Sequence, residues 1–114
     1  MKFDRFEDIK AWQKAKDLTL KIYTIFDLSK DFGFKDQIQR ASVSIMNNIA
    51  EGFERKSNNE FKYFLYIAKG SCGEVRSMLI LAKELNKIPN SDAFELESLS
   101  QEISKMISGL IKTL

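Results

Sequence analysis

Basic side chains recur at regular spacing around the middle of the 114-residue chain. Six of them form a candidate nucleic-acid contact, the basic stripe: Arg55, Lys56, Lys62, Lys69, Arg76 and Lys83. The last four lie seven residues apart, so on a helix they would share one side and could follow a phosphate backbone. Most are lysines, which lack the bidentate geometry with which arginine recognises guanine, so we expect contacts with little sequence preference. A solvated helix face without a ligand is the alternative.

A second candidate surface combines charged and uncharged polar side chains. We call it the polar stripe, and it comprises Gln37, Arg40, Ser44, Asn48 and Glu51, with Glu74 from the next segment as a partner across the bundle. Serine and asparagine are poor helix-interior residues, because their side chains compete for backbone hydrogen bonds. We therefore expect a recognition surface or a buried polar ladder, with Asn48 or Glu51 partly buried and Glu74 paired with Arg40 or Asn48. A plain solvated face is the alternative.

The chain lacks the residues that common catalytic and metal centres require. It contains no histidine and one cysteine. Ser-His-Asp and Cys-His nucleophiles, histidine zinc sites and the Glu-x-x-His centres of ferritin-like bundles therefore cannot form. Cys72 falls among apolar residues and is expected to be an inert, reduced core residue. The sequence predicts no catalytic residue, no metal and no cofactor.

Composition indicates an ordinary globular protein. Hydrophobic residues make up 44% and charged residues 30%, and the length favours one domain spanning residues 1–114. The net charge is only +2, but residues 55–87 carry seven basic and three acidic side chains. Such a local excess is compatible with a polyanionic partner. No apolar run approaches the roughly 18 residues that a membrane span needs, so we expect a cytoplasmic protein without a membrane partner.

Apolar residues recur at helical spacing in four segments, 7–28, 34–53, 58–86 and 92–114. The third segment has the most regular seam: Phe61, Leu65, Ala68, Cys72, Val75, Leu79 and Ala82. Gly52 lies where a C-terminal helix glycine is expected, and Ser57 with Glu60 forms a capping box. Four amphipathic helices with short connections predict an all-α protein, an antiparallel up-down-up-down four-helix bundle.

A second stripe runs beside the seam of the third segment. Its members are Tyr63, Tyr66, Gly70, Gly73, Ser77 and Ile80. A glycine inside a helix costs about 1 kcal/mol relative to alanine, so we expect another backbone to approach closely at both glycines. A monomeric bundle needs only one core-facing stripe per helix. The surplus apolar surface therefore predicts a homo-oligomer.

The second segment carries a family resemblance. It contains Gln37-Ile38-x-Arg40-Ala41-x-x-Ser44-Ile45-x-x-Asn48-Ile49-Ala50-Glu51-Gly52-Phe53. This pattern resembles the signature of bacterial four-helix bundle proteins encoded by intervening sequences in 23S ribosomal RNA genes. The opening Phe6-Glu7-Asp8-Ile9-x-x-Trp12-Gln13-x-Ala15 resembles the same family. The likeness continues in the third segment and so spans almost the whole chain; the residues that carry it there are Ser57, Phe61, Phe64-Leu65, Ile67-Ala68, Gly70-Ser71 and Glu74. Met46 departs from it, since many members carry proline there.

The resemblance implies a bundle that assembles as a cyclic homopentamer. It also implies kinship with the accessory proteins of diversity-generating retroelements, which are basic pentameric barrels that engage nucleic acid and a reverse transcriptase. This chain is less basic than those proteins, which weakens a nucleic-acid function carried over from them. No settled biochemical role comes with the intervening-sequence family itself.

Three functions compete on this basis. The leading interpretation is a non-enzymatic oligomeric scaffold or interaction module, with RNA, DNA or an RNA-bound protein as candidate partners beside further copies of the chain. The alternative is a direct, weakly specific nucleic-acid-binding protein. An enzyme comes third. A basic stripe that lines one continuous face or pore of the oligomer would favour binding, whereas its neutralisation by glutamates of a neighbouring copy would favour the scaffold.

Overall fold

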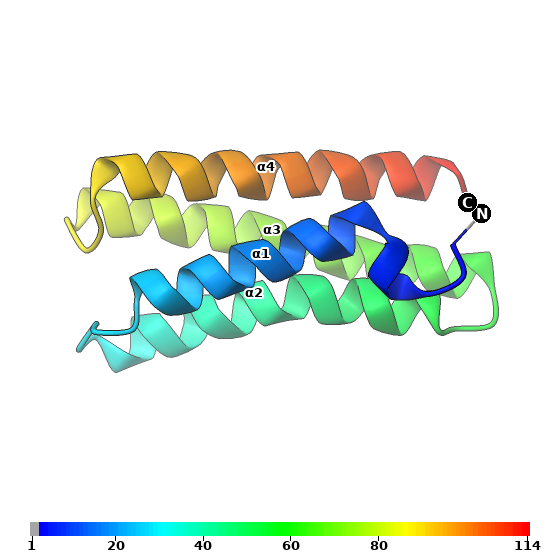
Figure 1. Ribbon diagram of the computed structural model, residues 1–114, viewed down its shortest axis with the longest axis horizontal. Coiled ribbons are helices and arrows are strands. Elements are labelled where there is room, and N and C mark those ends of the chain that lie inside the picture. The colour runs from blue at the N-terminus through cyan, green and yellow to red at the C-terminus, as the bar shows by residue number, and fades with distance from the viewer. Residues whose placement is uncertain (1–2) are drawn as a thin grey trace.

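Four long helices form the computed structural model, which describes residues 3–114. A short 3-10 turn, η1 (Phe6–Asp8), precedes α1 (Lys10–Ile25), α2 (Phe32–Phe53), α3 (Asn58–Glu84) and α4 (Asn90–Lys112). Successive helices run in opposite directions along a body of 43 × 21 × 19 Å (Figure 1). The all-α four-helix bundle predicted from the apolar periodicity is confirmed.

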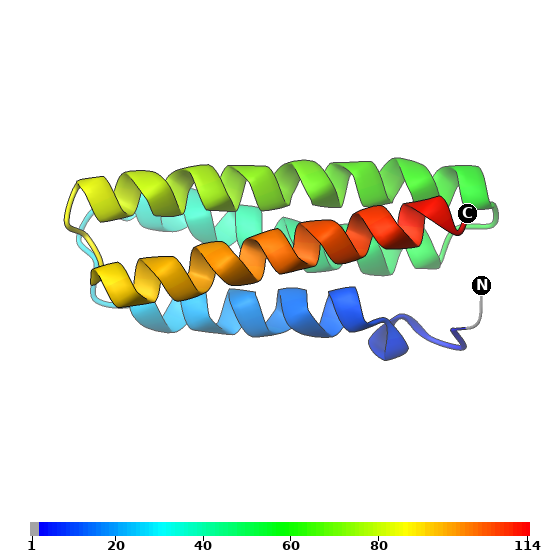
Figure 2. The ribbon, with the colours of Figure 1, turned by 90° about the horizontal axis from the view of Figure 1, so that it is seen from above.

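The helices occupy the corners of a square. α1 packs against α2 and α4, and α3 packs against the same two helices, so α1 and α3 are diagonal to each other. Figure 2 shows α1 and α3 on opposite sides of α4. Because of this arrangement, the solvent-facing sides of α1 and α3 point away from each other.

The core contains the predicted seam of α3, whereas the stripe that α4 buries differs from the predicted one. The whole α3 seam is buried, together with Ile38, Ile45 and Ile49 of α2. In α4 the buried residues are Ala93, Leu96, Ser100, Ile103, Ile107 and Ile111. The spacing of Leu96, Leu99, Ile103, Met106 and Leu110 predicts one apolar stripe for this helix, but Leu99, Met106 and Leu110 are only half-buried. Two adjacent stripes of α4 are largely apolar, and its position between α1 and α3 decides which of them faces the core.

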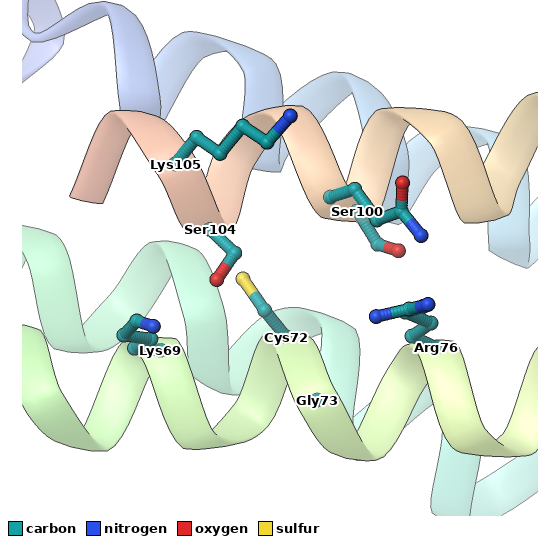
Figure 3. A pocket seen from close by; sticks show the side chains of 8 residues that line it. Lys69, Cys72, Gly73, Arg76, Ser100, Ser104 and Lys105 are labelled. Atoms are coloured by element: carbon teal, nitrogen blue, oxygen red, sulfur yellow. The ribbon is translucent and has the colours of Figure 1, made fainter. Parts of the chain in front are cut away.

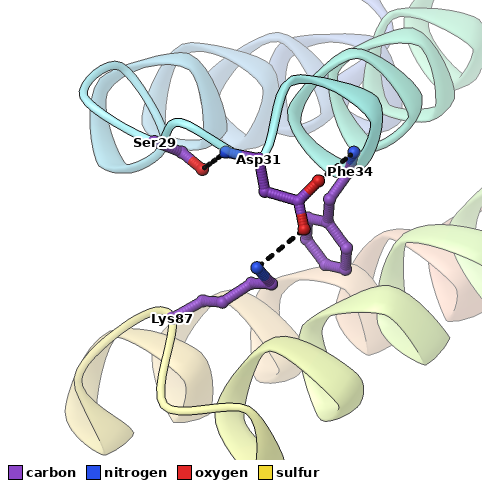
Figure 4. Close-up of polar contacts among 4 residues, drawn as sticks. All are labelled: Ser29, Asp31, Phe34 and Lys87. Carbon is purple, nitrogen blue, oxygen red and sulfur yellow. Dashed lines mark hydrogen bonds and ion pairs between the residues drawn. The ribbon is translucent and has the colours of Figure 1, made fainter.

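Asp31 sets the start of α2 and ties together one end of the bundle. Its carboxylate accepts hydrogen bonds from the Phe34 backbone N–H at 3.2 Å and from Lys87 Nζ at 2.8 Å (Figure 4). The Lys87 bond and then the Phe34 bond hold the pKa of Asp31 below its usual value. Because this cap forms, residues 32 and 33 are helical rather than part of the predicted break.

The other boundaries shift by a few residues. Ile9 is extended and separates η1 from α1, which ends at Ile25 rather than near residue 28. At the start of α3, Ser57 Oγ accepts a hydrogen bond from the Glu60 backbone N–H at 3.1 Å, as the capping box predicts. The α4 helix begins directly after Pro89, two residues earlier than expected.

The glycines have different roles from those predicted. A Cβ on Gly52 would lie 2.7 Å from Phe64 Cβ and 3.0 Å from Phe61 Cδ1, so this glycine permits the close approach of α2 and α3. It lies within α2 and is not a helix cap. A Cβ on Gly70 or Gly73 would meet no atom within 4 Å. The close approach predicted at these two positions is therefore wrong for contacts within the chain.

Candidate functional site

The middle of the polar stripe lies where α2 packs against α3. Ser44 Oγ is 2.9 Å from Ser71 Oγ of α3, and Asn48 Nδ2 donates to the Ser44 hydroxyl at 3.0 Å. Asn48 also donates to the Ser44 carbonyl at 2.8 Å. All three side chains are half-buried, as predicted for Asn48, whereas Glu51 is exposed. The stripe thus contributes a small hydrogen-bonded cluster between two helices.

The predicted partner of Glu74 is wrong. Glu74 Oε2 accepts a hydrogen bond from Gln37 Nε2 at 3.3 Å, and it pairs with neither Arg40 nor Asn48. Arg40 is exposed and pairs instead with Asp36, one turn earlier on the same helix, at 2.8 Å. Residues four apart on a helix meet without any tertiary adjustment, which explains why the local pair forms.

We expect the Ser44–Ser71 contact to be measurable as a coupling between α2 and α3. Ser44→Ala, Ser71→Ala and the double variant should show a coupling of about 0.5–1.5 kcal/mol in the free energy of unfolding, determined by urea titration. The matched control is a second cycle in which Arg40→Ala takes the place of Ser44→Ala and is combined with Ser71→Ala. Arg40 forms its hydrogen bond with Asp36 and forms none with Ser71. Additive effects in the first cycle would show that the hydroxyls do not bind each other.

Carboxylates of the same chain occupy both ends of the basic stripe. Arg55 pairs with Glu51 at 3.5 Å and lies over the Phe64 ring, 4.7 Å from its centroid. Lys83 Nζ pairs with Glu97 Oε2 of α4 at 3.5 Å. Lys56, Lys62, Lys69 and Arg76 have no carboxylate within 4.0 Å among residues 3–114. The stripe is therefore partly neutralised, and its middle retains its charge.

Lys69 and Arg76 border a groove of about 330 Å³ between α3 and α4. Cys72 and Gly73 line its α3 side, and Ser100, Gln101, Ser104 and Lys105 line its α4 side. Figure 3 shows Cys72 and Ser104 facing each other across this groove, with Arg76 directed from α3 toward α4. Lys105 was not singled out from the sequence, since only the register of α4 against α3 places it in the lining of a groove that Lys69 and Arg76 also border. Figure 3 shows its ammonium directed away from α3.

The groove is electrostatically positive. None of its eight lining residues is acidic. With the Gln101 amide turned so that its oxygen faces Arg76, that oxygen accepts hydrogen bonds from Arg76 Nε at 3.0 Å and Nη2 at 2.9 Å. Burial raises the pKa of the Cys72 thiol to about 12, although nearby Lys69 lowers it slightly. At neutral pH the thiol is uncharged and unsuited to nucleophilic chemistry.

Two exposed apolar faces lie on opposite sides of the bundle. The α3 outer face comprises Tyr63, Tyr66, Ile67, Ile80 and Leu81, with Gly70 among them. The α1 outer face comprises Leu20 and Tyr23. Tyr63 is 64% exposed, Tyr66 60% and Leu20 59%, so none of these side chains is used by the core. Tyr63, Tyr66 and Ile67 lie within about one turn of α3, and clustered exposed apolar residues typically mark a binding surface.

Neither a group of metal ligands nor a membrane-spanning helix is found among the described residues. Residues 3–114 bring together no group of three or more carboxylate or cysteine side chains that could hold a metal ion. In the same part of the chain, every helix is too short or too polar to cross a lipid bilayer.

These features define an all-α protein of the antiparallel four-helix bundle class, with apolar outer faces and a basic groove. The chain belongs to the 23S rRNA-intervening sequence protein family, whose model matches residues 7–109. It is similar to a crystal structure from Bacteroides thetaiotaomicron, described as a protein of unknown function from the S23 ribosomal protein family. The TM-score is 0.84 at 26% identity, covering 90% of this chain and 98% of the other. No curated protein matches the chain.

Proposed function

We propose that the chain is a non-enzymatic scaffold whose copies associate head to tail, the α3 outer face of one copy packing on the α1 outer face of the next. The observation that carries this proposal is the pair of exposed apolar faces on opposite sides of one bundle. Two different surfaces that bind each other generate a ring when the rotation between copies closes. One self-complementary face would instead give a two-fold dimer.

Gly70 supports a second copy as the occupant of the α3 outer face. Glycine inside a helix costs about 1 kcal/mol relative to alanine, and packing within this chain gives no reason for it at Gly70. The absence of a side chain leaves room beside Tyr66 and Ile67 for the backbone or a side chain of another molecule. The size of the ring rests on the family resemblance, which implies five copies.

The head-to-tail contact is tested by light scattering on the wild-type chain and on two double variants, each carrying two substitutions by uncharged glutamine. We expect the wild-type chain at micromolar concentration to have five times the 13.2 kDa mass of one copy. Tyr66→Gln/Gly70→Gln removes the α3 outer face, and Leu20→Gln/Tyr23→Gln removes the α1 outer face. Each variant alone should be monomeric. An equimolar mixture should form a one-to-one complex, because each variant retains the face that the other lacks.

The control for this experiment is Leu28→Gln, which changes a side chain that is 89% exposed at the end of the bundle and outside both faces. It should leave the mass unchanged, and circular dichroism should show all variants to be equally helical. A wild-type chain that stays monomeric would refute the scaffold. If the wild-type chain is oligomeric but the mixture of the two double variants stays monomeric, the contact between copies is symmetric and not head to tail.

A second candidate function is direct, weakly specific binding of nucleic acid by α3. It is favoured by Lys62, Lys69 and Arg76, for which residues 3–114 provide no carboxylate partner within 4.0 Å. The family name links these proteins to ribosomal RNA, so RNA is the first polyanion to test. In a ring the exposed cations of each copy would be multiplied, which strengthens the local field.

A further inference from the structure

We propose that the groove between α3 and α4 binds a phosphoryl group, with Lys69, Arg76 and Lys105 as the cations that hold it. This inference rests on the second candidate function and narrows it to one place and one chemical class of ligand. The sequence pattern alone pointed to a line of cations along α3. The structure instead places cations of two helices in the lining of one concavity. The Lys105 ammonium is directed away from α3 in Figure 3 and would reach a bound ligand by rotation of its exposed side chain.

Three carboxylates of α4 lie next to lysines outside the groove lining. Glu95 pairs with Lys21, and Glu102 pairs with Lys14, both on α1. Glu97 pairs with Lys83, toward the far end of α3. Three cations thus border one concavity without an acidic neighbour in its lining. A concave site with low-dielectric walls concentrates the potential of such charges and attracts an anion.

The donors in the groove suit the oxygens of a phosphoryl group. With the Gln101 amide oxygen turned toward Arg76, that oxygen accepts hydrogen bonds from Arg76 Nε and Nη2, which fixes the plane of the guanidinium and leaves its other N–H groups available. A guanidinium held in this way can donate two parallel hydrogen bonds to one phosphate. The Ser104 hydroxyl adds a neutral donor on the opposite wall, and the protonated Cys72 thiol adds no negative charge.

Gly73 keeps the groove open. It lies inside α3, where glycine costs about 1 kcal/mol, and no atom lies within 4 Å of the position of a Cβ. Core packing therefore gives no reason for glycine at this position. A larger side chain would project into the space between Lys69 and Arg76 and would exclude a ligand. The groove thus accounts for Gly73, as the outer face accounts for Gly70.

The phosphoryl group could belong to an RNA backbone or to a small phosphorylated molecule. Two probes distinguish these sources: a labelled ten-nucleotide single-stranded RNA, followed by anisotropy, and inorganic phosphate, followed by amide chemical shifts of Gly73 and Ser104. Both titrations use the full chain at low salt and again near physiological salt. Binding of the RNA should fall with salt, because each neutralised phosphate releases counterions.

Two double variants that each lose two positive charges distinguish a defined binding site from diffuse electrostatic attraction. Arg76→Gln/Lys105→Gln removes two cations of the groove, and Lys56→Gln/Lys62→Gln removes two cations outside it. We expect the groove variant to weaken binding of the RNA about tenfold or more, and the control variant less than threefold. Gly73→Leu keeps every charge but fills the groove, and it should weaken binding as strongly. Ser104→Leu fills the groove from α4, in case Gly73→Leu changes the oligomeric mass.

The possible outcomes separate this proposal from the function on which it rests. Equal losses in the groove and control variants would overturn the groove while retaining RNA binding by diffuse charge. Binding that survives both Gly73→Leu and Ser104→Leu would also overturn the groove. No binding of RNA together with phosphate-induced shifts at Gly73 and Ser104 would retain the groove and assign it to a small phosphorylated ligand. No binding of either probe at low salt would refute both the phosphoryl site in the groove and nucleic-acid binding by α3.

Discussion

Gly52→Ala should lower the free energy of unfolding by about 1–3 kcal/mol, even though alanine is the better helix former. The added Cβ would lie 2.7 Å from Phe64 Cβ and 3.0 Å from Phe61 Cδ1. Phe64 Cβ is attached directly to the backbone of α3, so the clash cannot be relieved by rotating a side chain. The two helices must separate, and the packing around Phe61 loosens. Urea denaturation followed by circular dichroism measures the loss.

The matched control is Gly109→Ala in α4. Gly109 is exposed, helical and without any atom within 4 Å of the position of a Cβ. The same substitution should therefore raise the free energy of unfolding by up to about 1 kcal/mol. Opposite signs at the two glycines are the expected result. If Gly52→Ala also stabilised the chain, α2 and α3 would not be in close contact at Gly52.

Leu65→Ala should cause a still larger loss, about 2–5 kcal/mol in the free energy of unfolding. Leu65 is fully buried in the α3 seam, within a core to which all four helices contribute. Truncation removes buried methyl groups and leaves a cavity that close-packed helices fill only in part. A domain of this size commonly has a total stability of 5–15 kcal/mol, so the variant should also show a clear drop in Tm.

Leu28→Ala provides the comparison, since Leu28 is 89% exposed in the connection between α1 and α2. Its effect should stay within about 0.5 kcal/mol. Thermal and urea unfolding of both variants would measure the difference. Similar small losses at both positions would mean that Leu65 is not packed as the structure describes.

The proposed assembly and the proposed phosphoryl site involve different sides of α3. The core seam of this helix builds the bundle, its outer face is available to another copy, and its side toward α4 borders the groove. Gly70 and Gly73 lie three residues apart, one on the outer face and one in the groove. Under these two proposals, the second apolar stripe of α3 serves the contact between copies and its basic stripe serves the groove.

The sequence by itself determined the helices and most of the core. Hydrophobic periodicity is a local property, and a continuous helix converts it directly into a buried face. The seam from Phe61 to Ala82 is therefore buried as predicted. Capping is equally local, because a side chain such as Ser57 needs only the backbone three residues ahead of it. The family pattern in the second segment is likewise visible without any structure.

The tertiary structure alone decided how neighbouring helices meet. Gly52 permits a close helix contact while Gly70 and Gly73 do not, because a Cβ clash depends on the register of α2 against α3. Register also pairs Glu74 with Gln37 and places Lys105 in the lining of the groove that Lys69 and Arg76 border. Helical spacing specifies which residues of one helix share a side, but it carries no information about the sliding and rotation of one helix against another. The groove depends on those two quantities, which is why its α4 half could not be predicted from the sequence.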